Sequence, residues 1–555
     1  MFSKARQIFS ALSHEERLAF SGALLVAFFS LAFLGLNAFN RMTTEVPVRG
    51  GSYTEGVIGQ PTYINPVIAV SEADRDLVAL VFANVYDLAE KIEAEDSGQS
   101  WKVRLKENAK WHDGELVTSD DVIFTIEKIQ DPEARSPLSA SWRGISAERV
   151  SEREIRFDLA APYAFFEDNL RRLHPIPKHL FADIPLPNWR LSLYNLEPVG
   201  SGPYRVAGSD KRRDGYIMEY RLIANEAYVN GYPYIDTFVL KFYSDEERLL
   251  QAWNLAQIDG VGGIEPSLLP RLRLRYQLFS LTAPRYYAVF WNSSVNPVLK
   301  DKNVRLALAQ AVNKEEMVAA IFGGNAVVSY GPIPPTSEAL GAALAMVPSA
   351  DTRYSEESAN IILDNSGWKR DEDGFRAKVS GKSKTLIEFN LVVPQVPFLK
   401  ETAEYLKTSW NKIGVKANVI LLSPQDIASE VIRARNYEAL LYGNILSGNP
   451  DLFSFWHSSQ RFSPGLNLAL YENKTADRLI ERIRQSQDQD ARAKDQGTLQ
   501  SLIVEDQPAL FLYSPNYLYV AARALRGFEL SSLITPPDRF RGVEKWYVKT
   551  ARTFQ

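Results

Sequence analysis

The chain of 555 residues contains no cysteine. This absence excludes disulfides, thiolate metal sites, cysteine nucleophiles and a lipid-modified N-terminal cysteine. Charge of one sign is not in excess either, because 63 lysines and arginines stand against 67 aspartates and glutamates. No long basic run supplies the electrostatic footprint that nucleic-acid binding requires. We therefore expect no nucleic-acid partner.

Long apolar runs are also scarce, but one lies near the N-terminus. Residues 18–39, "LAFSGALLVAFFSLAFLGLNAF", carry no charge over 22 positions, which is enough to span a bilayer. A cleaved signal has a shorter apolar region and small residues before its cleavage site, whereas Leu36 occupies the first position of the best candidate, "LNA". The run therefore predicts an uncleaved transmembrane anchor.

The charges beside this run predict its orientation. Lys4, Arg6 and Arg17 precede it, and Arg41 and Arg49 follow it, which favours a cytoplasmic N-terminus by the positive-inside rule. We expect residues 1–17 to be a cytoplasmic tail, with the large remainder on the outer side of the plasma membrane. Residues 40–51 are expected to be a linker. The first folded region is expected to begin at residue 48, so the two ranges overlap.

The remaining chain is too long for one core and has the composition of a globular protein, which predicts two or three domains. Strand-like runs alternate with helical patterns: residues 237–243, "TFVLKFY", precede 244–257, where Ser244 and Glu247 have the spacing of a capping box. Residues 301–322 and 396–414 are further helical patterns, and 473–506 predicts two helices broken near residue 488. This alternation predicts α/β lobes.

The stretch "WHDGELVTSDDVIF" at 111–124 combines a histidine with several acids. Thr118 and Asp121 have the spacing of a helix-capping pair, and Asp113-Gly114 is typical of a tight turn. A catalytic role for His112 would need a nucleophile or a metal-binding partner at useful spacing, and the sequence offers none. We therefore interpret the stretch as scaffold.

Residues 101–129, "WKVRLKENAKWHDGELVTSDDVIFTIEKI", resemble the extracellular solute-binding proteins of family 5, the peptide and oligopeptide receptors of ABC importers. The similarity covers the chain from about residue 48 to the C-terminus. It is carried, in order along the chain, by "GQPTYINPVIA" (59–69), the stretch at 101–129, "VGSGPYRV" (199–206), "ANEAYVNGYPYIDTFVLKFYSDEERLLQAWNLAQIDG" (224–260), "NVRLALAQAVNKEEMVAAIFGGNAVVSYGPIPP" (303–335), "YEALLYG" (437–443) and "NPDLFSFWHSSQ" (449–460).

The resemblance implies a bilobed α/β fold like that of periplasmic binding proteins (type II, cluster C), with a third domain inserted in the first lobe and the transmembrane helix in front. Lobe I would comprise 48–86, 200–285 and 516–555, the inserted domain 87–199, and lobe II 286–515. The implied function is capture of an extended solute, most often an oligopeptide, by lobe closure and delivery to ABC transporter permease subunits.

Main-chain contacts to such a ligand would come, by the same resemblance, from two segments: Ala69, Val70 and Ser71, and Asn444, Ile445 and Leu446. Peptide-binding relatives often carry, near the position of Ser447, an aspartate that pairs with the ligand's α-amino group. This sequence has no acid there until Asp451. The ligand could then be a peptide with a blocked or shifted N-terminus, a peptidoglycan fragment, a sugar oligomer, or a peptide held through Asp451.

Several further side chains are candidates for the cleft, and each has a structural alternative. Trp291 and Asn292 end a strand-like run, and they face either the cleft or the core of lobe II, because strand residues alternate faces. Tyr63 and Asn65 are open to the same two readings. Trp142 either walls one end of the pocket or packs within its own domain.

We expect a monomer with no cofactor, no metal site and no catalytic residues. A surface sensor or adhesin-like peptide-binding protein on the same fold is the alternative to an importer receptor. A tethered hydrolase would need a nucleophile, a base and oxyanion donors that the sequence does not assemble.

Overall fold

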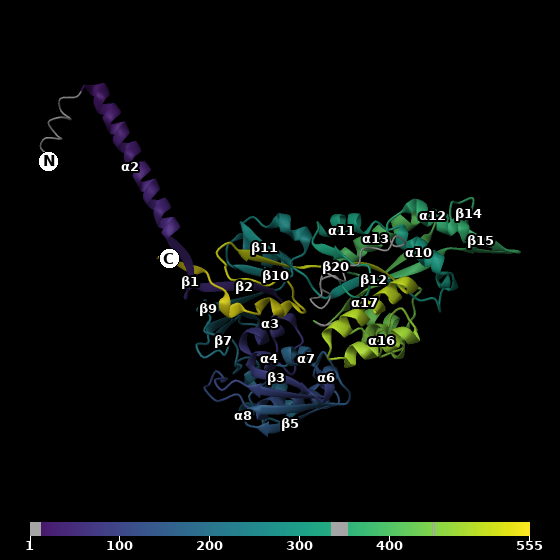
Figure 1. The fold of residues 1–555 in the computed structure, drawn as a ribbon, viewed down its shortest axis with the longest axis horizontal. Coiled ribbons are helices and arrows are strands. Elements are labelled where there is room, and N and C mark those ends of the chain that lie inside the picture. The colour runs from purple at the N-terminus through teal and green to yellow at the C-terminus, as the bar shows by residue number, and fades with distance from the viewer. Residues whose placement is uncertain (1–12, 335–352, 447, 449, 555) are drawn as a thin grey trace.

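The computed structural model describes residues 13–334, 353–446, 448 and 450–554. Helix α2, His14–Met42, stands apart from the rest of the chain (Figure 1). Its N-terminus is capped by Ser13, whose side chain accepts from the Glu16 amide. This helix is long and apolar enough to cross a membrane, and none of its apolar window is buried.

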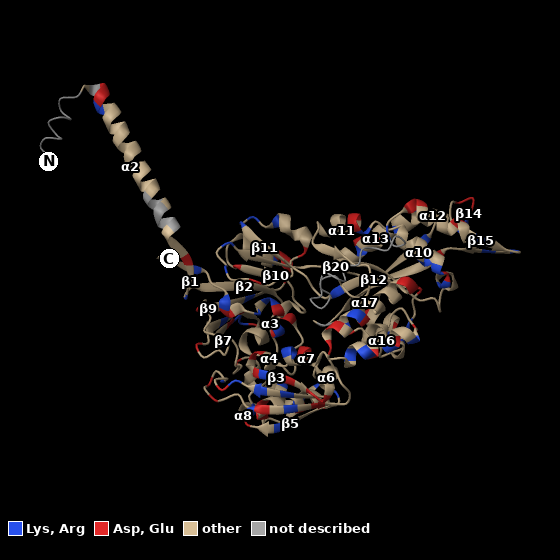
Figure 2. Cartoon of the chain, in the orientation of Figure 1, with Lys and Arg blue, Asp and Glu red and all other residues tan. Residues whose placement is uncertain are grey.

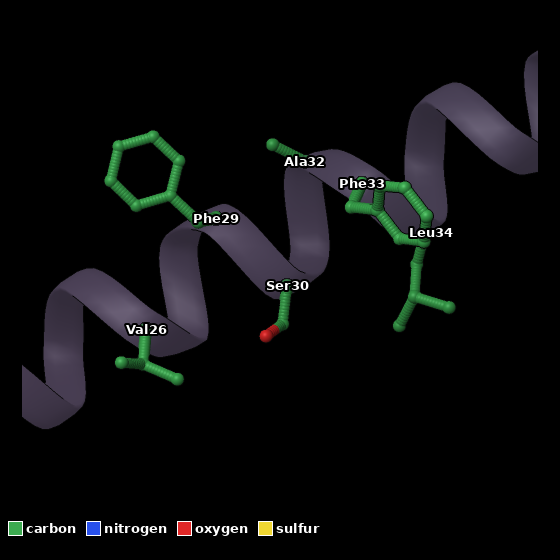
Figure 3. Close-up of a pocket in the computed structure, with 6 residues that line it drawn as sticks. All are labelled: Val26, Phe29, Ser30, Ala32, Phe33 and Leu34. Carbon is green, nitrogen blue, oxygen red and sulfur yellow. The ribbon is translucent and has the colours of Figure 1, made fainter.

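The described surface of α2 is apolar beyond its N-terminal end, and its apolar side chains are exposed. The charged residues of its described part gather at its N-terminal end (Figure 2). Val26, Phe29, Phe33 and Leu34 project from the helix in several directions (Figure 3), and Phe29 and Phe33 are 66% and 67% exposed. Helices that are apolar all round occur in the cores of large proteins and as membrane spans, and α2 is not buried in the described part of the chain.

A seven-stranded mixed sheet forms one body of the remainder. Its strands are, in spatial order, β11 Tyr276–Leu281, β21 Tyr517–Ala522, β10 Gly260–Gly262, β2 Ser52–Ile58, β9 Thr237–Tyr243, β8 Ile217–Ala224 and β7 Tyr204–Lys211. The neighbouring helices in sequence are α3 Glu72–Val81, α4 Val85–Leu88 and α9 Glu246–Asn254. The predicted strand at 237–243 is confirmed. The cap of α9 is Asp245, not Ser244, because the Asp245 carboxylate accepts from the Arg248 amide and the Ser244 hydroxyl donates to Asp245.

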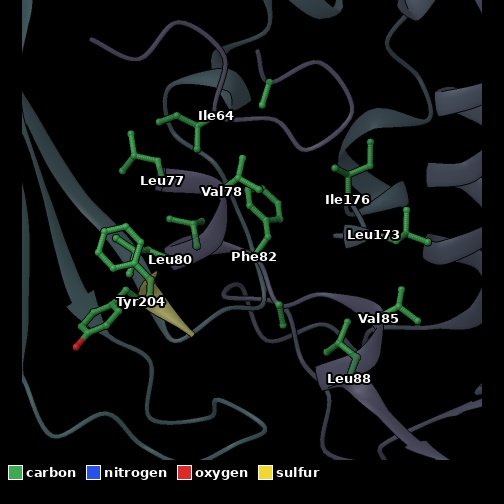
Figure 4. Packing of buried hydrophobic residues seen from close by; sticks show 14 of the residues in the cluster. Ile64, Leu77, Val78, Leu80, Phe82, Val85, Leu88, Leu173, Ile176 and Tyr204 are labelled. Carbon is green, nitrogen blue, oxygen red and sulfur yellow. The ribbon is translucent and has the colours of Figure 1, made fainter. Parts of the chain in front are cut away.

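A smaller antiparallel sheet lies below it in Figure 1, with strands β3 Ala89–Glu95, β4 Ser100–Leu105, β6 Glu154–Leu159 and β5 Ile145–Ser151. Its helices are α5 Ser119–Gln130, α6 Ser139–Trp142, α7 Phe166–Arg172 and α8 Lys178–Phe181. One hydrophobic core extends from the seven-stranded sheet into this region. Figure 4 shows Val78 and Phe82 near Leu173 and Ile176 within that core.

A six-stranded sheet forms the third body, with the order β13 Ala326–Val328, β20 Ala509–Pro515, β12 Arg285–Trp291, β19 Ala439–Ile445, β17 Glu388–Pro394 and β18 Lys416–Leu422. Two separate cores involve its strands. Its helices are α10 Lys302–Gln310, α11 Lys314–Phe322, α12 Glu356–Asn365, α13 Pro397–Lys412, α14 Pro424–Asp426, α15 Phe453–Trp456, α16 Lys474–Gln485 and α17 Gln489–Asp506. A small sheet of β14 Lys369–Arg370, β15 Arg376–Ser380 and β16 Ser383–Leu386 projects from one end (Figure 1).

Two helical expectations in this region have different outcomes. The break near residue 488 is confirmed, because Asp488 caps α17. The pattern at 301–322 forms two helices, since Asn313 accepts from the Glu316 amide and starts α11 after the chain has left α10. The apolar periodicity continues across Asn313, so the pattern alone does not show that a second helix begins there.

Residues 40–51 are not all linker. Residues Thr43–Val48 form strand β1, which pairs antiparallel with β22, Lys549–Phe554, at the C-terminal end of the chain. Strands β1 and β22 thus pair at the C-terminal end of α2 (Figure 1).

Candidate functional site

His112 lies at the junction between the four-stranded and seven-stranded sheets. Its backbone amide donates to the Gly200 carbonyl at 2.7 Å, the Gly200 amide donates to Nδ1 at 3.2 Å, and Nε2 lies 3.2 Å from the Gly202 carbonyl. Burial lowers the pKa of His112 to about 4, so the ring is neutral at pH 7. A side-chain Cβ at position 200 would lie 1.9 Å from the Val81 carbonyl oxygen, so the close approach requires glycine.

The rest of this stretch agrees with its interpretation as scaffold. Thr118 and Asp121 form the predicted capping box at the start of α5. The Gly114 amide donates to the Trp111 carbonyl, and Gly114 has φ +100°, which suits glycine in a tight turn.

The chain crosses between the seven-stranded and six-stranded sheets twice, from β11 to β12 and from β20 to β21. The two crossings are tied together, because Arg285 donates from Nε and Nη2 to the Pro515 carbonyl at 3.2 and 3.1 Å. The Ser514 hydroxyl donates to the Ala283 carbonyl at 3.0 Å. The two connecting segments thus lie side by side.

The predicted binding loop after β19 starts at these crossings. Leu446 is buried and its amide donates to the Pro284 carbonyl at 2.7 Å. Asn444 is buried and donates from Nδ2 to the Tyr286 hydroxyl at 2.8 Å. Ile445, on the alternate face of the strand, is 64% exposed. The loop thus combines a fixed buried side with an exposed side, while Ser447 lies outside the described residues.

Gly448, one residue further along, contacts two other parts of the fold. A Cβ built there would lie 2.9 Å from Ile534 Cδ1 and 3.4 Å from Asp168 Oδ1. Asp168 is buried and comes from α7 beside the four-stranded sheet, and Ile534 comes from the C-terminal segment. The loop therefore touches all three bodies.

Asp451 already has partners within the protein. Its Oδ2 accepts from Arg484 Nε at 3.1 Å and from the Tyr163 hydroxyl at 3.1 Å. The Ala164 amide donates to the Arg484 carbonyl at 2.7 Å, and Phe165 packs in a core of the six-stranded sheet. Asp451 thus joins the segment before α7 to helix α16.

The first predicted segment leads into α3. Asn65 is buried and its Oδ1 accepts from the Val67 amide at 3.0 Å. Ser71 caps α3 by accepting from the Asp74 amide. Val70 is 58% exposed and Ala69 is buried, and Tyr63 is half-buried with Arg190 5.2 Å from its ring centroid. Of the segment 69–71, Val70 presents the most side-chain surface.

The two tryptophans and Asn292 lie inside the protein. Trp291 packs edge-on against Phe389 at 5.7 Å and beside Trp410 at 6.0 Å. Trp142 is buried against Phe157 and Phe166.

Asn292 is buried, and its Nδ2 donates to the Arg435 carbonyl at 2.9 Å. All three side chains are buried.

A buried charged cluster lies in the seven-stranded sheet. Arg539 donates from Nε to Glu55 at 3.0 Å and from Nη1 and Nη2 to Asp76 at 2.8 and 2.5 Å. The Tyr519 hydroxyl donates to Glu55 at 2.9 Å. Burial raises the pKa of Glu55 to about 7. The glycine at position 260 makes room for this cluster, since a Cβ there would lie 2.2 Å from Glu55 Oε2.

No local sequence pattern predicts the roles of Asp168, Arg484, Tyr163 or the Glu55–Asp76–Arg539 cluster. Each role depends on contacts between segments far apart in the chain, which the spacing of neighbouring residues does not predict. Within the described part of the chain, no group of three or more histidine, aspartate or glutamate side chains is arranged to hold a metal ion.

Comparisons with known proteins agree with this architecture along nearly the whole chain. The oligopeptide-binding protein AppA of Bacillus subtilis is 27% identical over 95% of this chain and 97% of its own length. Its structure in complex with a nonapeptide superposes with a TM-score of 0.68, at 26% identity, over 91% of this chain and all of that one.

The substrate-binding protein CtaP of Listeria monocytogenes shares the fold, with a TM-score of 0.75 at 23% identity over 90% of this chain and all of that one. The model of the bacterial extracellular solute-binding proteins, family 5, matches residues 84–464 of the 555. The protein is therefore a member of family 5 of the bacterial extracellular solute-binding proteins, with their bilobed α/β fold.

Proposed function

We propose that this protein is an extracytoplasmic receptor that captures an oligopeptide and delivers it to an ABC transporter. The observation that carries the proposal is the chain-long similarity to AppA, whose structure holds a nonapeptide. The similarity to importer receptors favours this function over a surface sensor or adhesin.

The capture step follows from the arrangement of the three bodies. We propose that lobe I comprises 48–86, 200–285 and 516–555, that 87–199 form the inserted domain and that lobe II is 286–515. The core shared by the first two supports their movement as one unit. The paired crossings at 282–284 and 516 would then act as the hinge on which lobe II closes.

The ligand contacts proposed for the two loops are main-chain contacts. Val70 and Ile445 present exposed surface beside carbonyls and amides, while their neighbours Ala69, Asn444 and Leu446 are buried and fixed. An extended peptide can bind such segments as an added strand, and this tolerates varied side chains.

Asp451 is a poor partner for a ligand's α-amino group in this conformation. Its carboxylate is shared between Arg484 and Tyr163, so a ligand amine would compete with an existing ion pair. This supports a ligand whose N-terminus is blocked or placed elsewhere, a peptidoglycan fragment, or another extended solute over a peptide anchored through Asp451.

The site of action follows from α2. We propose that α2 is an uncleaved anchor in the plasma membrane, with residues 1–17 in the cytoplasm, that the ectodomain is monomeric, and that its partners are the membrane-embedded permease subunits. The apolar window of α2, none of which is buried in the described part of the chain, supports the anchor.

The test uses the full chain reconstituted in lipid nanodiscs. Its thermal unfolding is followed while four ligand pools are added: peptides with a free N-terminus, the same peptides N-acetylated, muropeptides, and oligosaccharides. A ligand at about 100 times its Kd stabilises the protein by about 2.7 kcal/mol. Stabilisation by either peptide pool supports the receptor, and the pair of peptide pools shows whether a free amine contributes. A response to oligosaccharides alone, or to no pool, contradicts oligopeptide capture.

A further inference from the structure

The strand that follows α2 is paired from its first residue. Helix α2 ends at Met42 and β1 begins at Thr43. All six residues of β1 pair with β22, from Thr43 opposite Phe554 to Val48 opposite Lys549. The chain therefore passes from the helix into a two-stranded ribbon without an intervening loop, and the other strand of the ribbon is the C-terminal end of the described chain (Figure 1).

This ribbon packs little against the body. Every residue of β22 is exposed. In β1, Thr44, Glu45 and Val48 are exposed, Val46 and Pro47 are half-buried, and Thr43 is buried. Within the ribbon, Arg552 lies 3.5 Å from Glu45 and donates to the Thr43 hydroxyl at 3.3 Å. A two-stranded ribbon alone is marginally stable in water, so a contact outside the protein would add to its stability.

Phe554 is placed to supply that contact. Phe554 is 70% exposed and lies opposite Thr43. Thr43 is four residues beyond Phe39, where the apolar run ends. With the apolar run 18–39 placed in the hydrocarbon core, Thr43 would lie about 6 Å beyond its edge, at about 1.5 Å per helical residue. The headgroup layer on each side of a bilayer is about 5–8 Å deep. A Phe side chain at that depth buries its ring among the lipid headgroups and the first acyl carbons.

We propose that Phe554 on β22 is a second membrane contact, which enters the headgroup layer of the outer leaflet beside α2. This inference rests on the anchor role of α2 proposed above. The receptor is then held by a two-stranded stalk of about 20 Å, at about 3.4 Å per residue, instead of a flexible single-chain tether. The stalk fixes the height of the lobes over the membrane and restricts their rotation toward a permease.

The first experiment measures the environment of Phe554 in the full chain. Because the sequence has no cysteine, Phe554→Cys carries a single nitrobenzoxadiazole label in nanodiscs of phosphatidylcholine and phosphatidylglycerol. Phe462→Cys is the matched control, since Phe462 is 66% exposed and lies in the region of the six-stranded sheet. We expect blue-shifted emission and quenching by headgroup spin-labelled lipid at position 554 and neither at 462. Identical, water-like emission at both positions overturns the proposal.

A second experiment tests the ribbon. Thr44→Cys with Thr553→Cys places two cysteines at a directly paired position, whereas Thr44→Cys with Ala551→Cys places the second two residues out of register. We expect oxidation to cross-link the first pair much faster than the second. Equal rates overturn the stalk. A chain released from the membrane by cleavage within α2 overturns the anchor and the contact together, whereas a membrane-held chain with residue 554 in water overturns only the contact.

Discussion

Replacing Arg539 with methionine would remove the guanidinium that faces two buried carboxylates. Arg539 is 2% exposed, Glu55 and Asp76 are fully buried, and three hydrogen bonds of 2.5 to 3.0 Å join them. Methionine retains much of the apolar stem but leaves both acids without their cation. Breaking a buried ion pair from one side costs about 3–5 kcal/mol, so we expect a loss of that size in the free energy of unfolding at pH 8.

The loss should depend on pH in a defined direction. Burial already raises the pKa of Glu55 to about 7 with Arg539 present, and without the guanidinium the pKa of both acids rises further. As the pH falls, the native variant takes up protons that the unfolded chain does not yet bind, which stabilises it. We therefore expect a smaller deficit relative to the wild type at pH 5 than at pH 8.

Urea unfolding of the full chain in nanodiscs, with hydrogen exchange read in β2 and β21, measures this deficit in the sheet that holds the cluster. Arg541→Met is the control, because Arg541 is exposed and donates to the Ser532 carbonyl, and its loss should cost less than about 0.5 kcal/mol. A deficit equal for both variants, or one for Arg539→Met that does not change with pH, would refute the electrostatic reasoning.

Three further substitutions test other parts of the structure. Burial lowers the pKa of His112 to about 4, so as the pH falls from 6.5 to 4 the unfolded chain binds a proton that the native wild type does not, and stability should fall by up to about 3 kcal/mol. His112→Gln should flatten this part of the profile of melting temperature against pH. An unchanged profile contradicts the junction role. Tyr286→Phe leaves the amide of Asn444 and the indole N–H of Trp456 without their buried acceptor, so we expect a loss of about 1–3 kcal/mol per group in urea unfolding; a loss below about 0.5 kcal/mol argues against these bonds. Thr118→Ala removes the hydroxyl that donates to Asp121 Oδ2 at 3.0 Å at the start of α5 and should cost about 1 kcal/mol. Thr118→Ser is the control that retains the hydroxyl, and equal melting of the two variants contradicts its role in the cap.

The sequence predicted the features that depend on neighbouring residues. The α5 capping box, the turn at Gly114 and the break before α17 each arise within a few residues, where side chain and backbone choose a local conformation. The predicted cap at Ser244 was wrong by one residue, because Ser244 and Asp245 are adjacent and both can accept a backbone amide. In the structure it is Asp245 that accepts from the Arg248 amide.

The candidate site was less predictable for a different reason. Alternation along a strand leaves open which parity faces the core, so the burial of Trp291 depends on Phe389 and Trp410, both distant in sequence. The partner of Asp451 is equally remote, since Arg484 belongs to another helix. Such pairings follow from the folded topology and have no local signature.

The pairing of the two ends of the ectodomain has a consequence for how the protein is made. Glu55 and Arg539 are 484 residues apart, and the first outer strand, β1, pairs with the last, β22. The seven-stranded sheet also contains β21, Tyr517–Ala522, so it cannot be completed until nearly the whole chain has been synthesised. The strands of the six-stranded sheet all lie between Arg285 and Pro515 and can pair earlier. Contacts of such long separation form slowly and leave early strands exposed to aggregation. The anchor proposed for α2 would keep β1 at the membrane surface during this interval, ready to pair with β22.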